Sequence, residues 1–278
     1  MLVANILCYF LGDFMLRIMI AGNDRRSEKV ALILEESLSD TEVILLRNSE
    51  QLSRGADVYL LPIPFSTDGV NINNSALSCT TQKFIKSIKK DALVISAGVN
   101  GEGIINMSNR DDFAYKNAVP TAEGAIKLAI DATDKTLADS NILITGFGRV
   151  AKLLAHRLFP FSKNIAVAVR KDADKALIDS LGMNAIAIDT LAEHLKRFDI
   201  IFNTIPHKIF NIHTLSAAKE GSVFIELASA QSGFDTETIK SLPVNYINAP
   251  GLPGKIAPDT AGKIMAETVI NIIKENNG

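Results

Sequence analysis

The chain has 278 residues, a length that suggests two domains, and 47% of them are hydrophobic and 22% charged, the ordinary composition of a globular protein. Its formal net charge of −2 gives no electrostatic basis for binding nucleic acid. Two cysteines without paired spacing and four isolated histidines indicate neither a disulfide framework nor a metal site. We therefore expect a two-domain protein of the reducing cytoplasm, without a metal.

The first sixteen residues are apolar but interrupted by Asn5, Gly12 and Asp13. They are fewer than the roughly 20 residues that a membrane span needs, and they lack the basic start of a signal peptide. We expect residues 1–16 to be an extension outside the core fold and expect no membrane partner. The alternative is an additional packing segment.

Residues 17–120 alternate short apolar runs with helix-compatible segments. Strands are predicted at 17–21, 42–46, 57–62 and 92–97, and a short extended piece at 114–118. Helices are predicted at 27–37 and 80–89, and a loop over 64–79. This alternation is typical of an open α/β sheet, which we expect to form an N-terminal substrate and catalytic domain.

Pro120, Thr121 and Glu123 together predict the start of a helix, with Thr121 as its N-cap. This helix would lead the chain into a second domain, residues 121–256. Six strands separated by helices are predicted there, at 142–144, 165–169, 184–188, 200–204, 222–227 and 245–248. They indicate a Rossmann fold, which is a doubly wound parallel sheet. The last helix, 257–278, is expected to pack back toward the first domain.

The stretch from Asn141 to Ala151 has the strand, glycine turn and helix of a dinucleotide-binding unit, in the form G-x-G-x-x-A. Gly146 permits the tight turn, Gly148 lets the backbone approach a pyrophosphate, and Ala151 lets the helix pack closely. The helix N-terminus then offers free N–H groups to the phosphates. The residues expected to bind the cofactor here are Gly146, Phe147, Gly148, Arg149 and Val150. The alternative is a tight turn that binds nothing.

The second strand of this domain is followed by Arg170 and Lys171. A carboxylate at this position would accept a hydrogen bond from the ribose 2′-hydroxyl of NAD, whereas two cations suit the 2′-phosphate of NADP. We therefore expect NADP, and NAD stays open as the alternative. A solvated basic turn would explain the two cations equally well.

Ligands of a doubly wound sheet bind beyond the carboxyl ends of its strands. The later strands end in small residues and prolines, which let the backbone approach a cofactor. The residues expected to bind it there are Thr204, Ile205, Pro206, Leu227, Ala228, Pro250 and Gly251. His207 follows as a candidate acid or base, or as a surface residue, and Glu226 is expected to be a buried, paired carboxylate.

Several longer motifs make the sequence resemble one family, dipicolinate synthase A, one of the two subunit types of that enzyme. These motifs are Asn117 to Gly124, Gly146 to Arg149, Asn203 to Pro206 and Ala249 to Gly254, followed by Ala257-Pro258 and Thr260-Ala261-Gly262. The resemblance extends over residues 17–274 in one order and spacing, and the first and fourth motifs are more specific than the glycine turn.

The resemblance implies an NADP-dependent oxidation of dihydrodipicolinate, or of its hydroxytetrahydro precursor, to dipicolinate. This acid branches from the lysine pathway and accumulates in bacterial endospores. The resemblance also implies a partner, the flavoprotein-like dipicolinate synthase B, and a location in the cytoplasm of the mother cell. The oligomeric state is not given by the sequence, and a homo-oligomer stays open.

A pyridine dicarboxylate is a dianion, so its site needs cations and N–H groups. Arg26 matches an arginine of the family's pattern and follows the first strand, where a ligand should lie; pairing with Asp24 is the alternative. The residues expected to bind the substrate are Arg26, Arg25, Ser96, Gly98 and Asn100. Those expected to take part in catalysis are Asn117, Thr121 and Glu123, although Glu123 would also stabilise a helix dipole in a first turn. The acid and base stay unassigned.

Two other functions are compatible with the sequence. One is a different two-domain dehydrogenase, of the 2-hydroxyacid or shikimate type, although the catalytic His–Glu or Lys–Asp set of those enzymes is not evident. The other is a non-catalytic NADP-binding protein that serves an enzyme as a sensor or scaffold. Redox turnover distinguishes the enzyme from the sensor.

Overall fold

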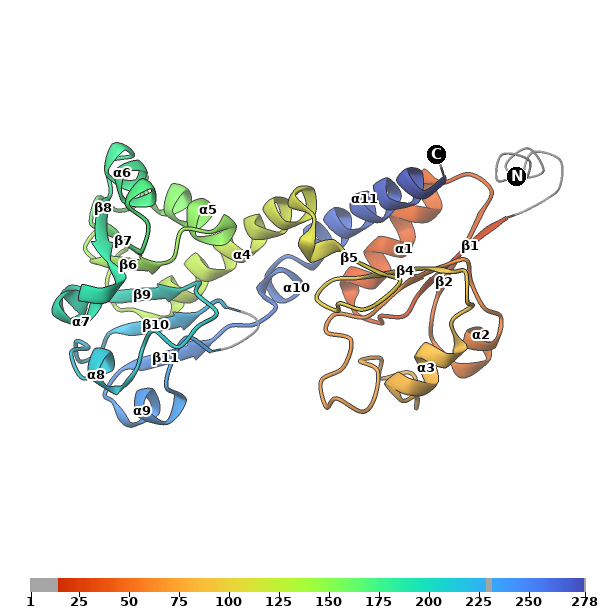
Figure 1. Cartoon of the computed structure of the whole chain (residues 1–278), viewed down its shortest axis with the longest axis horizontal. Coiled ribbons are helices and arrows are strands. Elements are labelled where there is room, and N and C mark those ends of the chain that lie inside the picture. The colour runs from red at the N-terminus through yellow and green to blue at the C-terminus, as the bar shows by residue number, and fades with distance from the viewer. Residues whose placement is uncertain (1–14, 229–231, 278) are drawn as a thin grey trace. The chain divides into compact units, whose positions relative to one another are not determined.

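The computed structural model describes residues 15–228 and 232–277 (Figure 1). These residues form two compact units. The first extends to Ala114 and resumes at Pro258, and the second is Tyr115–Ala257. The sequence placed these boundaries after residues 120 and 256. Residues 1–14, which make up most of the predicted N-terminal extension, lie outside the described residues.

The first unit contains a five-stranded parallel sheet in the order β2-β1-β3-β4-β5. Its strands are β1 (Leu16–Ile20), β2 (Thr41–Leu45), β3 (Val58–Leu60), β4 (Leu93–Ser96) and β5 (Ile104–Asn106). Apolar clusters cover both faces, which explains why the central strands are continuous apolar runs. The short extended piece predicted at 114–118 is wrong because that segment is helical, and the fifth strand, β5, lies ten residues earlier.

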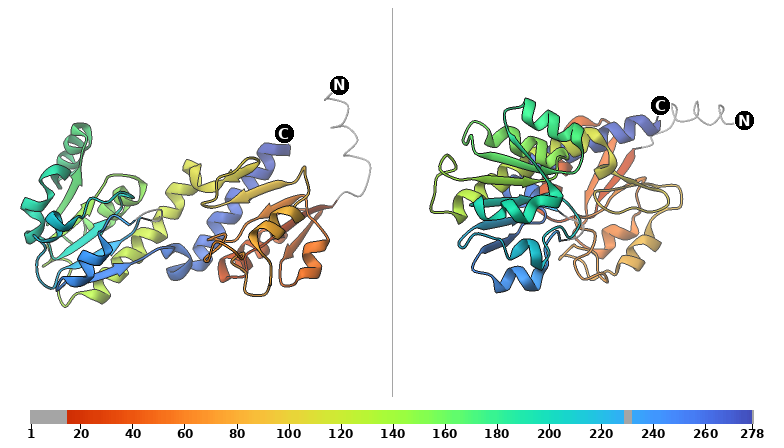
Figure 2. Two further views of the ribbon diagram at one scale, coloured as in Figure 1. Left: turned by 60° about the horizontal axis from the view of Figure 1, so that its bottom comes forward. Right: turned by 60° about the vertical axis from the view of Figure 1, so that its left-hand side comes forward.

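Two helices pack together on one face of this sheet: α1 (Arg25–Ser37) and α11 (Pro258–Asn277) (Figures 1 and 2). Their backbones approach closely at Gly262, where a Cβ would lie 2.8 Å from the carbonyl oxygen of Arg26. The contact therefore requires a glycine. The shorter helices α2 (Ser49–Ser53) and α3 (Thr81–Ser87) complete the unit.

Helix α4 (Asp111–Ala132) runs from the first unit into the second. The prediction that Thr121 begins this helix is wrong, because the helix starts ten residues earlier and contains Pro120. Proline has no N–H to donate to the carbonyl four residues back. The Thr121 hydroxyl donates to the carbonyl of Asn117 (2.9 Å), as hydroxyls of helix interiors do. Pro, Thr and Glu in series resemble a helix start, but they lie within a longer helix.

The second unit contains a six-stranded parallel sheet in the order β11-β10-β9-β6-β7-β8. Its strands are β6 (Ile142–Thr145), β7 (Ile165–Val169), β8 (Asn184–Ala187), β9 (Ile200–Asn203), β10 (Val223–Glu226) and β11 (Asn245–Asn248). The predicted doubly wound Rossmann sheet is confirmed, because the strand order reverses direction between β6 and β9.

Helices cover both faces of this second sheet. They are α5 (Arg149–Leu158), α6 (Asp172–Ser180), α7 (Leu191–His194), α8 (Ile212–Leu215), α9 (Thr236–Ser241) and α10 (Leu252–Ile256). One apolar cluster packs α4, α5 and α6 against the sheet, and the other fills the opposite face. Among the described residues, no helix is long and apolar enough to cross a membrane.

Candidate functional site

The glycine turn after β6 has two glycines that are needed for different reasons. Gly146 has φ = +88°, and a Cβ there would lie 2.7 Å from Thr204 Oγ1 and 2.9 Å from Ile205 Cγ1. Both the backbone angle and the crowding exclude a side chain. The first glycine therefore shapes the turn itself.

Gly148 has space in front of it instead. It is the N-cap of α5 in an extended conformation, without a side-chain hydrogen bond to the helix N-terminus, and a Cβ built there meets no atom within 4 Å. Ala151 is fully buried, so α5 packs closely on the sheet. The turn thus leaves open the place where a pyrophosphate would meet the N–H groups of α5, and these residues fit a dinucleotide.

Helix α4 lies alongside α5 and contacts it at two places. The Arg149 guanidinium lies 5.7 Å from the Tyr115 ring centre, and Arg157 Nε lies 3.3 Å from Glu123 Oε1. Both pairs are separated by eight residues along their helices, so α4 and α5 run in parallel. Arg149 is therefore held beside the glycine turn by an aromatic ring of α4.

The predicted catalytic residue Glu123 lies beside the carboxyl end of α5, away from the glycine turn. Eight residues of helix correspond to about 12 Å, which separates its partner Arg157 from the glycine turn along the axis of α5. Its side chain is 57% exposed. The alternative role of Glu123, in a first helical turn, is wrong because the residue lies in the middle of α4. Asn117 lies half-buried on the same helix.

Arg170 and Lys171 both lie exposed directly after β7. Arg170 forms no hydrogen bond or ion pair with the rest of the described chain, and Lys171 is the N-cap of α6. The carboxylate next to them, Asp172, accepts a hydrogen bond from Lys175 (2.9 Å). Both cations are therefore available at the edge where the 2′ position of an adenosine ribose lies in such folds.

Hydrogen bonds link the carboxyl ends of three adjacent strands of the second unit. Thr145 Oγ1 donates to Asn203 Oδ1 (2.6 Å), and Asn203 Nδ2 donates to Glu226 Oε1 (2.8 Å). The Thr204 hydroxyl donates back to the carbonyl of Thr145 (2.7 Å). The segments expected to bind the cofactor after β6, β9 and β10 are thus held by one buried network.

The remaining predicted cofactor residues also follow strands at this edge. The Ile205 N–H donates to Asn203 Oδ1 (3.1 Å), with Pro206 next in the chain, and the Ala228 N–H donates to Glu226 Oε1 (3.0 Å). After β11, Gly251 is left-handed at φ = +69° and is the N-cap of α10. Asn203 was noted only as the start of a family motif and Glu226 only as a buried, paired carboxylate. Glu226 is indeed buried, and its partners are hydrogen-bond donors of Asn203, Ala228, Ser232 and Gly233.

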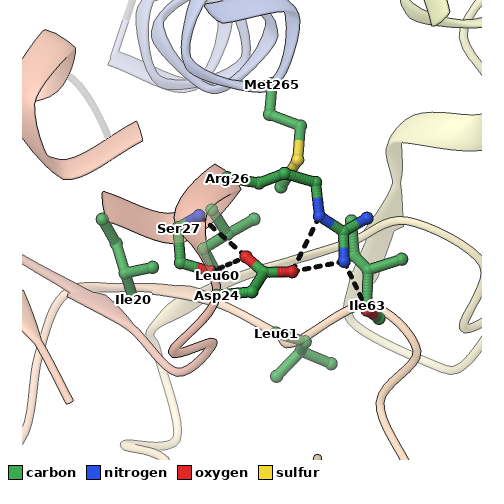
Figure 3. Close-up of a pocket in the computed structure, with 8 residues that line it drawn as sticks. All are labelled: Ile20, Asp24, Arg26, Ser27, Leu60, Leu61, Ile63 and Met265. Carbon is green, nitrogen blue, oxygen red and sulfur yellow. Dashed lines mark hydrogen bonds and ion pairs between the residues drawn. The ribbon is translucent and has the colours of Figure 1, made fainter. Parts of the chain in front are cut away.

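Arg26 lines a small pocket at the carboxyl ends of β1 and β3 (Figure 3). Its Nε donates to Asp24 Oδ2 (2.7 Å), and its Nη2 contacts Asp24 Oδ2 and donates to the carbonyl of Ile63 (2.7 Å). The side chain is 14% exposed. The alternative pairing with Asp24 is therefore formed, and Nη1 makes no hydrogen bond within the described chain.

Asp24 is fixed from both sides. Its Oδ1 caps α1 by accepting hydrogen bonds from the N–H and the hydroxyl of Ser27, both 2.9 Å. Burial opposes its ionisation, but these bonds and the Arg26 guanidinium hold the pKa of Asp24 below its ordinary value. Ile20, Leu60 and Met265 form the apolar part of this pocket (Figure 3).

The other predicted substrate residues are mostly engaged within the first unit. Arg25 forms a bidentate ion pair with Asp259 of α11 (2.8 and 3.0 Å). Ser96 is buried, and its hydroxyl donates to the carbonyl of Val99 (2.7 Å). The Ser96 hydroxyl is therefore used within the chain, and Asp259 engages two of the five N–H donors of the exposed Arg25 guanidinium.

Asn106, the last residue of β5, organises the turn after β4, a role that the sequence did not predict. The N–H of Gly98 donates to Asn106 Oδ1 (2.9 Å), and Asn106 Nδ2 donates to Asn100 Oδ1 (2.9 Å). This leaves a strand-end turn in which Gly98 adopts φ = +110° and a Cβ would meet nothing within 4 Å. The Gly98 N–H is thus used by Asn106, and of these two predicted substrate residues only Asn100, through its Nδ2, has a side-chain donor without a hydrogen bond in the described chain.

Comparison with known proteins connects this arrangement to a family. Residues 113–242 match the NAD binding domain of D-isomer specific 2-hydroxyacid dehydrogenases. The dipicolinate synthase A of Bacillus subtilis (strain 168) is 30% identical, over 94% of this chain and 96% of that protein. The chain belongs to the dipicolinate synthase A family. The resemblance noted in its motifs is confirmed.

Solved structures of the dipicolinate synthase A family agree in fold. The crystal structure of the family member from Bacillus halodurans has a TM-score of 0.82 at 25% identity, covering 92% of this chain and 97% of that one. The corresponding protein from Bacillus subtilis has a TM-score of 0.80 at 26% identity, covering 94% and 97%. This member of the family therefore has the architecture of a two-unit oxidoreductase with a nicotinamide-cofactor domain.

Proposed function

We propose that this chain oxidises dihydrodipicolinate, or its hydroxytetrahydro precursor, to dipicolinate, with NADP as the hydride acceptor. The observation that carries the proposal is the match to a dipicolinate synthase A over 94% of this chain, which covers both units rather than the nucleotide domain alone. The open space before Gly148 and the free cations after β7 support a dinucleotide at the second unit.

The cofactor would be held by three groups of residues at the carboxyl edge of the second sheet. The turn from Gly146 to Val150 presents N–H groups to the pyrophosphate, and Arg149 adds a charge beside it. Arg170 and Lys171 would contact a 2′-phosphate, which favours NADP over NAD. The segments 204–206, 227–228 and 250–251 would surround the nicotinamide, which when bound accepts the hydride.

The substrate is a dianion, and we place one of its carboxylates at Arg26. Its Nη1 is available in a small pocket that Asp24 and Ser27 line together with apolar side chains such as Leu60 and Met265. Asp24 already occupies the other side of the guanidinium, so a carboxylate must bind against the repulsion of that charge. The Asn100 Nδ2, which donates no hydrogen bond within the described chain, would bind the second carboxylate beside the open space at Gly98, whereas two N–H groups of Arg25 are engaged by Asp259.

The chemistry makes modest demands on the protein because loss of hydride and proton produces an aromatic ring. A weak base suffices for the proton, and a hydroxylated precursor also needs an acid for elimination. Of the three residues proposed on α4, Glu123 is paired with Arg157 and Thr121 with the helix backbone. The Asn117 amide makes no hydrogen bond within the described chain and is our preferred residue for orienting the substrate.

The family relationship also supports a partner and a setting. We propose that the chain works with dipicolinate synthase B, the other subunit type of the enzyme, in the mother cell of a spore-forming bacterium, where dipicolinate is made for the endospore.

The test is redox turnover with freshly generated dihydrodipicolinate and NADP, followed at the absorbance band of the reduced nicotinamide. The assay is run with and without dipicolinate synthase B, and with NAD in place of NADP. Substrate-dependent reduction supports the proposal. Tight binding of NADP without any reduction, even with that partner present, would instead identify a sensor or scaffold, and turnover of 2-hydroxyacids or shikimate would identify another dehydrogenase.

A further inference from the structure

Glu226 is a buried carboxylate without a cationic partner among the described residues. It is 1% exposed at the end of β10. Its Oε1 accepts hydrogen bonds from Asn203 Nδ2 (2.8 Å) and the Ala228 N–H (3.0 Å). Its Oε2 accepts hydrogen bonds from the Gly233 N–H (2.6 Å) and the Ser232 hydroxyl (3.3 Å). Removing a carboxylate from water is costly, and four donors are needed here to offset that cost.

The bonds of Glu226 hold the backbone on two sides of one strand end. Ala228 follows β10 after Leu227, and Ser232 and Gly233 contact the same carboxylate at this strand end. Gly233 packs so closely that a Cβ would lie 2.1 Å from Asn203 Nδ2. The backbone after β10 is therefore fitted against the end of β9 by one carboxylate, one amide and the absence of one side chain.

The position of this network in the sheet indicates what it supports. In a doubly wound sheet the first three strands, here β6, β7 and β8, form the adenosine half of the dinucleotide site. The strands β9, β10 and β11 form the other half, which receives the nicotinamide. Asn203 and Glu226 end two of these three strands, so their bonds set the backbone of Ile205 and Ala228 on the nicotinamide side.

We propose that Glu226 is a positioning residue for the nicotinamide half of the cofactor, an inference that rests on the nicotinamide cofactor of the proposed function. Glu226 is too buried to touch a ligand and acts through the backbone of Ile205 and Ala228. A glutamine of the same shape cannot replace it. One of its oxygens becomes an NH₂ group, which then faces N–H donors on whichever side it lies.

The experiment measures dissociation constants of the full chain by calorimetry for three ligands. NADP and NAD contain the nicotinamide, whereas adenosine 2′,5′-bisphosphate contains only the adenosine half. For Glu226→Gln we expect the constants for both dinucleotides to rise about tenfold or more, while that for the bisphosphate changes less than about twofold. The same variant should raise the KM for the cofactor in the turnover assay.

Asp199→Asn is the matched control, because Asp199 is also a buried carboxylate of this sheet but lies at its amino edge, before β9. We expect Asp199→Asn to lower the thermal stability and to leave all three dissociation constants within about twofold. A purely structural role of Glu226 would give the same result for both variants. The difference between dinucleotide and bisphosphate therefore separates positioning from stability.

Ser232→Ala is the second variant, and it decides the question if Glu226→Gln does not fold. It removes one donor to Oε2 and keeps the carboxylate, so the dinucleotide constants should rise about threefold with the bisphosphate unchanged. Equal losses for all three ligands, or no loss, would overturn the inference. If the parent chain binds the bisphosphate, but binds neither dinucleotide more tightly than the bisphosphate, the nicotinamide proposal is wrong. This inference then fails with it.

Discussion

The Lys219 Nζ atom lies 2.6 Å from Asp199 Oδ1 at the amino edge of the second sheet. Lys135 Nζ donates to the same oxygen (2.9 Å), and the Asn141 N–H donates to Oδ2 (2.9 Å). Burial opposes ionisation of this carboxyl, but these three donors hold the pKa of Asp199 at about 2. The group therefore links two lysines from distant parts of the chain to the start of β6.

We expect this carboxylate to make the stability of the second unit depend on pH. Its pKa is lower in the folded chain than the ordinary 3.8, so its stabilisation is complete above that value and is lost as the pH falls through about 2. Asp199→Asn should lower the free energy of unfolding at pH 7 by about 2 kcal/mol. Urea unfolding of the parent chain and the variant at pH 7 and near pH 2 measures this loss of stability. Asp172→Asn is the control, because Asp172 forms an exposed ion pair with Lys175. A deficit of equal size at both pH values would contradict the assignment.

The two glycines of the turn after β6 should respond in opposite ways. Gly148→Val places its side chain in open space, so we expect the melting temperature to stay near that of the parent chain and NADP binding to be lost. Gly146→Val meets Thr204 at a positive φ and should lower stability by about 1–3 kcal/mol. Calorimetry and thermal unfolding of both variants give the comparison. Unchanged NADP affinity in Gly148→Val would show that the pyrophosphate does not pass this turn.

Arg170 should determine the choice between NADP and NAD. Arg170→Asp replaces an attraction for the 2′-phosphate by a repulsion, and a charge-assisted contact contributes about 1.5–3 kcal/mol, so the NADP constant should rise tenfold or more with NAD little changed. Arg197→Asp, the same change of charge at the amino edge before β9, is the control. An equal loss for both cofactors would mean that Arg170 does not read the phosphate.

Arg26 and its partner Asp24 should have opposite effects on the substrate. Arg26→Ala should lower kcat/KM by about 10²-fold without changing NADP binding, since it removes a substrate clamp. Arg26→Lys should recover little, because an ammonium lacks the planar fork. Asp24→Asn keeps a capping side chain on α1 and removes the competing charge, so pyridine-2,6-dicarboxylate should bind more tightly.

Arg25→Ala is the control for these variants, because its ion pair with Asp259 is exposed and should contribute only about 0–1 kcal/mol to stability. It should leave kcat/KM unchanged. If instead Arg26→Ala turns over the substrate at the parent rate, the anion site lies elsewhere, and Arg25 or the turn from Gly98 to Asn100 is the next candidate.

On α4 we expect Asn117 rather than Glu123 to affect turnover. Glu123→Gln weakens an exposed pair with Arg157, which should cost about 0–1 kcal/mol of stability and leave kcat within about twofold. Asn117→Ala should lower kcat/KM with the melting temperature unchanged, because its amide has no partner to lose within the described chain. Steady-state kinetics of both variants test this. A large loss of kcat in Glu123→Gln would instead make Glu123 the catalytic residue.

The sequence by itself determined the parts of this protein that depend on neighbours in the chain. Most of the six strands of the second sheet are short apolar runs, and each of the six was predicted within about two residues of its place, a margin normal for element boundaries. The glycine turn was also predictable, because the strand, the positive backbone angle of Gly146 and the helix N-terminus all arise within eleven residues; only the crowding of Gly146 by Thr204 and Ile205 comes from a distant segment. Family membership followed from motifs that are likewise local.

The tertiary structure alone decided how polar side chains are paired, because their partners come from distant parts of the sequence. Asn203 meets Thr145 across 58 residues, and Arg25 meets Asp259 across 234. The same holds for α4. Local signals at Pro120 and Thr121 predicted that a helix begins there, but one continuous helix is maintained because its apolar face packs against the second sheet through Ala122, Ala125 and Ala129. The backbone hydrogen bond that Pro120 cannot make costs less free energy than burial of that apolar face provides. This balance is evident only in the assembled core.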